Sequence, residues 1–188
     1  MEGLKEIRKD AFIKGLTLGV LLLFIDILSL YLLAYSGSIA VIILSYLFAY
    51  LIIPLTAAII LIKKLRVKIG GYWNLRQATS GIFILLFSAY LLSSIGSFVF
   101  IKHIAPEITP KAKDNFVNVF SNFMEKADAD QDKIDETIED IEQKFDAMQQ
   151  ASFGSFLSSM LSSIIMLFVT ALIFAAIFKR EDPVSDQP

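Results

Sequence analysis

Long apolar blocks separated by short polar segments dominate this chain. The four blocks cover about residues 11–34, 38–62, 78–101 and 153–178. A helix rises about 1.5 Å per residue, so about 20 apolar residues span a hydrocarbon core of about 30 Å. A helix also satisfies its own backbone hydrogen bonds, which lipid cannot do. The pattern predicts an all-α fold, a four-helix transmembrane bundle that forms one integral membrane domain over residues 1–188.

The boundary between the first two blocks predicts a hairpin. Tyr35-Ser36-Gly37-Ser38 is the whole connection, and these residue types favour a tight turn. Three basic residues precede the first block and a fourth, Lys14, lies near its start, as in a signal peptide. However, the block is longer than the apolar core of about 7–15 residues in a signal peptide, and a second span follows at once. We therefore interpret it as an uncleaved helix.

The segment 102–152 between the third and fourth blocks predicts an amphipathic helical insertion. Its apolar residues recur in steps of three and four, the period of a helix. An acidic stretch at 128–133 separates two such runs, and Pro106 and Pro110 should delay the first helix until about Lys111. The insertion is then either a hairpin or one kinked helix. The apolar positions are Phe116, Phe120, Phe123 and Ala127, followed by Ile134, Ile138, Ile141, Phe145 and Met148.

The distribution of charge predicts the orientation in the membrane. Of 17 Lys and Arg residues, 11 lie before residue 15, at 63–76 or at 179–180. Segment 102–152 instead carries six lysines and twelve acidic residues. Since short basic segments stay in the cytoplasm, both termini should be cytoplasmic and 102–152 should face outward. The net charge of −2 gives no reason to expect a nucleic-acid partner.

Composition narrows the chemistry. Hydrophobic residues make up 55% of the chain, which has no cysteine and one histidine, His103. These numbers exclude disulfides, thiol catalysis and cysteine or multi-histidine metal sites. We expect no cofactor, and no pairing of a nucleophile with a base suggests an enzyme.

Several short motifs resemble a family of small bacterial four-span membrane proteins catalogued as a domain of unknown function (number four-one-nine-nine). The resemblance covers about Ala11 to Arg180, and the entry Gln77-Ala78 into the third helix is its most typical piece. It implies a location in the inner membrane and the four-span layout, and it carries no catalytic residues. The motifs are Gly71–Ala78, then Phe116, Phe120, Phe123 and Met124, and finally Lys179-Arg180.

Asp26 is the most unusual residue of the predicted spans, since an Asp at the centre of a membrane helix costs about 2.5–3.5 kcal/mol. It shares a stripe with Gly15 and Gly19, whose spacing permits close helix packing. Asp26 is therefore either a proton or cation site, or a neutral group that holds helices together, which we favour. Candidate partners with hydroxyl groups are Tyr90, Ser94 and Ser97 in the third span and Ser155, Ser159 and Ser162 in the fourth.

Two further motifs have a structural and a functional interpretation. Asp128, Asp130, Asp132 and Glu139 match ligand positions of a calcium loop, but Lys133 occupies the place of its obligatory glycine. We favour an acidic helix connection without a metal. Gly70-Gly71 followed by Tyr72-Trp73 suggests a turn and an aromatic anchor at the membrane interface.

These features predict a multi-pass inner-membrane protein without enzymatic activity, a scaffold or accessory component that acts through segment 102–152. The alternative is a small oligomeric transporter or channel that uses Asp26. The expected partners are the lipid bilayer, a membrane or envelope protein bound through 102–152, or further copies of the chain.

Overall fold

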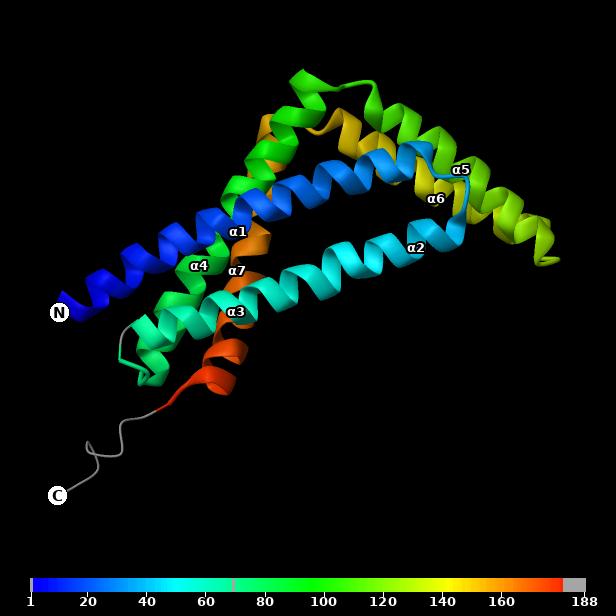
Figure 1. Cartoon of the computed structure of the whole chain (residues 1–188). Coiled ribbons are helices and arrows are strands. Elements are labelled where there is room, and N and C mark those ends of the chain that lie inside the picture. Colours follow the sequence, from blue (N-terminus) through cyan, green and yellow to red (C-terminus); the bar gives the residue numbers. More distant parts are fainter. Residues whose placement is uncertain (1, 69, 181–188) are drawn as a thin grey trace. The chain divides into compact units, whose positions relative to one another are not determined.

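The computed structural model describes residues 2–68 and 70–180, and these stretches are almost entirely helical (Figure 1). Within them no β-strand occurs, and one isolated antiparallel bridge pairs Trp73 with Arg180. The predicted all-α class is confirmed. In chain order the helices are α1 (Glu2–Tyr35), α2 (Ile39–Leu47), η1 (Phe48–Ile52), α3 (Ile53–Lys68), α4 (Leu75–Val99), η2 (Phe100–Ile104), α5 (Ile108–Lys126), α6 (Gln131–Gln150) and α7 (Phe153–Phe178).

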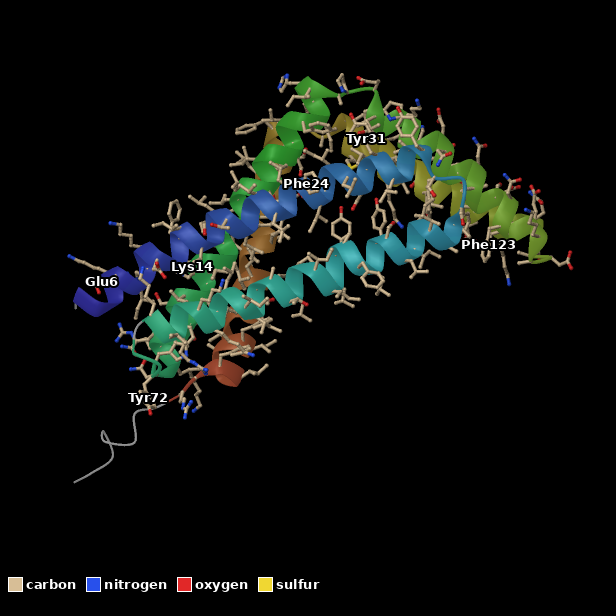
Figure 2. All side chains as sticks on the ribbon, viewed as in Figure 1. Glu6, Lys14, Phe24, Tyr31, Tyr72 and Phe123 are labelled. Atoms are coloured by element: carbon tan, nitrogen blue, oxygen red, sulfur yellow. The ribbon has the colours of Figure 1, made fainter. Side chains whose placement is uncertain are left out.

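Four helical stretches are long and apolar enough to cross a membrane, as the four blocks predicted. They are Lys5–Tyr35, Ile39–Lys68, Leu75–Ile104 and Phe153–Phe178. Large apolar side chains point outward along them: Leu161 is 67% exposed and Phe24, labelled in Figure 2, is 64% exposed. An apolar surface of this extent would be unstable in water. We conclude that the protein is embedded in a membrane.

The second span contains a short π-helical segment, η1, between α2 and α3. Pro54 follows it directly and has no backbone N–H, so the carbonyl of Tyr50, four residues earlier, loses its usual helical partner. A wider turn at this point is the common response to a proline inside a helix. Tyr50 lies within this π-helical segment.

The chain divides into two compact units, whose boundaries fall within the long helical stretches. The first unit comprises the described residues of 1–22, 53–94 and 157–188, and the second comprises 23–52 and 95–156. Each has its own apolar core. The first core includes Leu18, Ile62, Leu65, Trp73, Ile82 and Leu85, and the second includes Leu30, Leu33, Ile42, Ala105, Ile108 and Ala112.

In the first unit, α1 and α4 approach each other closely at two glycines. A Cβ atom at Gly15 would overlap the carbonyl of Leu85 and the hydroxyl of Ser88. A Cβ atom at Gly19 would lie 2.9 Å from the carbonyl oxygen of Ala89. Only glycine therefore permits this backbone separation, which is the packing that the Gly-x-x-x-Gly spacing favours.

The connection before α4 contains a buried tryptophan, contrary to expectation, and a cap that starts the helix. Trp73 is not an interfacial anchor, because it is 1% exposed and its indole N–H donates to the carbonyl of Phe178 at 2.8 Å. Asn74 and Gln77 form a reciprocal cap: each backbone N–H donates to the other side chain, at 3.0 and 2.9 Å. This capping box begins α4 and explains why the segment has those two residues.

Helices α5 and α6 form a hairpin rather than one kinked helix. The rings of Phe116 and Phe145 lie 6.5 Å apart, and the Nζ atom of Lys113 lies 3.0 Å from a carboxylate oxygen of Asp146. Helix α5 begins at Ile108, three residues earlier than expected. Pro110 falls in its first turn, where the backbone N–H groups have no helical partner and a proline costs little.

Candidate functional site

A polar cluster surrounds Asp26 in the second unit. The hydroxyl of Ser97, on α4, donates to a carboxylate oxygen of Asp26 at 3.0 Å. Ser29, one turn along α1 from Asp26, is buried, with an exposed fraction of 2%. The cluster thus lies inside the helical packing of this unit, where a polar group must find protein partners.

Two tyrosines of the second span complete this cluster. The hydroxyl of Tyr50, in η1, makes hydrogen bonds with Ser29 and Asp26, and Tyr46 lies within electrostatic range of Asp26. The rings of Tyr46 and Tyr50 are 5.1 Å apart. Sequence reasoning missed both. Asp26 precedes Ser36, in the hairpin turn, by ten residues, and Tyr46 and Tyr50 follow Ser36 by ten and fourteen residues. Residues equally far from a hairpin turn lie at similar depth, so counting from the turn could have found them.

Four of the other predicted partners of Asp26 belong to the first unit, whereas the fifth, Ser155, lies on α7 in the second unit. Tyr90 and Ser94 lie on α4 and are half-buried, whereas Ser159 and Ser162 lie on α7 and are exposed. Of the predicted hydroxyl groups, the structure brings Ser97 to Asp26. A role for the other five stays a prediction.

The α5–α6 hairpin is attached to the ends of the first two spans within the second unit. The side-chain amide of Asn115 donates to the carbonyls of Leu33 and Ser36, at 2.8 and 2.7 Å. The ammonium group of Lys111 lies 4.1 Å from the centre of the Tyr35 ring. Ala112, between them on α5, is fully buried. The hairpin is therefore held at its base by polar and apolar contacts together.

An apolar groove of about 500 Å³ lies where the hairpin meets the first two spans. Phe123, labelled in Figure 2, lines it from α5 and lies beside the beginning of α2. Eight of the nine lining side chains are wholly apolar. The lining residues are Leu33, Ile39, Ile42, Ile43, Tyr46, Phe116, Phe120, Phe123 and Phe145.

Helix α6 presents an acidic surface on the side away from its apolar stripe. One of its acids, Asp146, pairs with α5, and this hydrogen bond raises the pKa of Lys113 above its usual value. Lys113 is therefore charged at neutral pH. The exposed acids of α6 are Asp132, Asp135, Glu136, Glu139, Asp140 and Glu142, which we call the acidic face.

Comparison with known families identifies the chain. The family described as "Protein of unknown function (DUF4199)" matches residues 11–180, all but the two ends. The chain belongs to this family. No curated protein and no solved structure matches it. Since the family description assigns no activity, the function must be argued from the features of this DUF4199 protein itself.

In this DUF4199 chain the acidic stretch at 128–133 connects two helices. Asp128, two residues after the end of α5, has a φ of 51°. The side chain of Asp130 accepts the N–H of Asp132 at 3.2 Å and caps α6. The amide of Gln143 donates to Glu139 at 3.3 Å. Among residues 2–68 and 70–180, no group of three or more His, Asp or Glu side chains is arranged to hold a metal. The arrangement gives the calcium alternative no support.

Proposed function

We propose that this DUF4199 protein is a non-enzymatic, multi-pass protein of the bacterial inner membrane that acts as a scaffold or accessory component through its α5–α6 hairpin. The attachment of the hairpin carries this proposal. Asn115 and the buried base of α5 fix the hairpin to the ends of the first two spans. A helical pair fixed in this way presents its acidic face in a defined position, as an interaction surface requires.

The charge pattern supports an outward-facing hairpin. Lys and Arg residues gather at the N-terminus, at 63–76 and at 179–180, and they favour the cytoplasmic side for these segments. The amphipathic insertion then lies on the opposite side, between the third and fourth spans. Its apolar stripes meet at Phe116 and Phe145, whose rings lie between the two helices.

The acidic face suggests the chemistry of the partner. A surface with six exposed acids repels anionic lipid head groups and attracts a basic protein surface. We therefore expect a membrane or envelope protein with a basic patch to bind α6. A second copy of this chain is the other candidate, and a crosslink between identical chains would reveal it.

The test is crosslinking in native membranes with two variants of matched charge. In one, Asp135→Asn, Glu139→Gln and Glu142→Gln neutralise the acidic face. In the other, Glu107→Gln, Asp114→Gln and Glu125→Gln remove the same charge from exposed positions at or near α5. Partners crosslinked to the unchanged chain should be lost in the first variant and retained in the second. Equal crosslinking in both variants contradicts the proposal.

The Asp26 cluster favours a second candidate function, transport of protons or monovalent cations. A carboxylate together with hydroxyl groups supplies oxygen ligands and exchangeable protons. Tyr50 also comes from a π-helical segment, and such segments occur frequently at functional sites. Flux of protons or cations into liposomes that contain the purified chain would support this function if Asp26→Asn abolishes it.

A further inference from the structure

The apolar groove of the second unit joins a membrane span to the hairpin. Ile39, Ile42, Ile43 and Tyr46 come from the first two turns of the second candidate span, and Leu33 comes from the last turn of the first. The phenylalanine side of the groove comes from α5 and α6, which belong to none of the four spans. The groove therefore runs from the ends of two candidate membrane spans onto the hairpin.

We propose that this groove binds one acyl chain of a membrane phospholipid. Its lining offers a single polar group, the hydroxyl of Tyr46, so a polar ligand would lose its hydrogen bonds to water without replacement. Its volume of about 500 Å³ falls within the range of about 300–1,000 Å³ for small-molecule sites. This inference does not depend on the scaffold role.

Size and position decide between an acyl chain and other apolar occupants. A helix is about 10–12 Å wide with its side chains, so even ten residues need a volume on the order of 1,000 Å³. The groove holds about half of that. Ile43, on the α2 side, is 59% exposed and belongs to a candidate membrane span. A phospholipid chain can thus enter from the bilayer, and no charged residue in the lining would hold the carboxylate of a free fatty acid.

The test uses a phosphatidylcholine with a photoreactive diazirine on one acyl chain. The purified full chain is reconstituted with this lipid and irradiated, and the modified residues are located by mass spectrometry. We expect adducts on Phe116, Phe120 and Phe123, the α5 side of the groove. Lipids that merely surround the spans would not reach them. Asn118 and Asn122, exposed on other faces of α5, should stay unmodified.

Two neighbouring substitutions provide a matched pair. Ile43→Trp places a bulky ring in the groove, whereas Leu44→Trp places the same ring on a position of α2 that is 54% exposed and does not line it. Labelling of α5 should fall about tenfold in Ile43→Trp, as a loss of about 1.4 kcal/mol implies. It should remain unchanged in Leu44→Trp. Thermal unfolding of both variants in detergent verifies that each is folded.

Three results would overturn the proposal. Absence of adducts on the α5 phenylalanines would show that no acyl chain enters the groove. Equal labelling of Asn118 and Asn122 would show that α5 simply lies in lipid. A diazirine fatty acid that labels the groove while the phospholipid does not would reject a phospholipid as the occupant.

Discussion

At the scale of single residues, substitutions of Asp26 distinguish a role in helix packing from a role in binding protons or cations. Its contact with Ser97 and its hydrogen bond with Tyr50 can be made by a neutral side chain of similar shape. If packing is the role, Asp26→Asn should keep the thermal stability in detergent. Asp26→Leu should lower it slightly, since hydrogen bonds between membrane helices average about 0.6 kcal/mol. We also expect no cation flux in liposomes from the unchanged chain. Flux that is lost in Asp26→Asn contradicts the packing role.

Gly15 gives a second prediction at this scale. Gly15→Ala would force a methyl group into the backbone of α4 near Leu85, whereas a Cβ at Gly37 meets nothing within 4 Å. Overpacking of this kind costs about 1–3 kcal/mol. The midpoint of thermal unfolding in detergent should therefore fall for Gly15→Ala and remain close to the original value for Gly37→Ala. Equal midpoints would show that α1 and α4 do not pack this tightly.

At the scale of elements, the attachment of α5 to the spans makes a prediction about local stability. Asn115→Ala removes two hydrogen bonds to the carbonyls of Leu33 and Ser36 and leaves those carbonyls unpaired. Buried groups without partners cost about 1–3 kcal/mol each. Hydrogen exchange of the α5 backbone should therefore accelerate. Asn122→Ala is the control, because that amide bonds within its own helix, to Asn118. Unchanged exchange in Asn115→Ala would remove the argument for a fixed hairpin.

The positions of the helices could be predicted from the sequence, whereas several of their contacts could not. Apolar length alone located the four spans, and the helical period located α5 and α6. The choice between a hairpin and one kinked helix could not be made from the sequence, because the turn depends on the positive φ of Asp128. Trp73 was misjudged because its burial depends on the end of α7, more than a hundred residues away. The helical period did not predict the contact of Tyr50 with Asp26, because Tyr50 lies in a π-helical segment that departs from this period.

At the scale of the whole molecule, the central claim is a membrane protein whose hairpin lies on the side opposite to the basic connection at 63–76. The chain has no cysteine, so a thiol reagent reacts with a single introduced cysteine and with no other residue of the chain. Lys64 and Lys133 are both exposed, and replacing either by cysteine removes the same charge. Neither side chain is a partner in the ion pairs of the described residues, which involve Asp10 and Asp146.

The most direct measurement is therefore labelling of Lys64→Cys and Lys133→Cys with a maleimide that cannot cross the inner membrane. Spheroplasts are labelled intact, and lysed spheroplasts show that both thiols react once the barrier is removed. The account predicts that Lys133→Cys is labelled in intact spheroplasts and Lys64→Cys only after lysis. Labelling of Lys64→Cys but not Lys133→Cys in intact spheroplasts would contradict the orientation and place the hairpin in the cytoplasm.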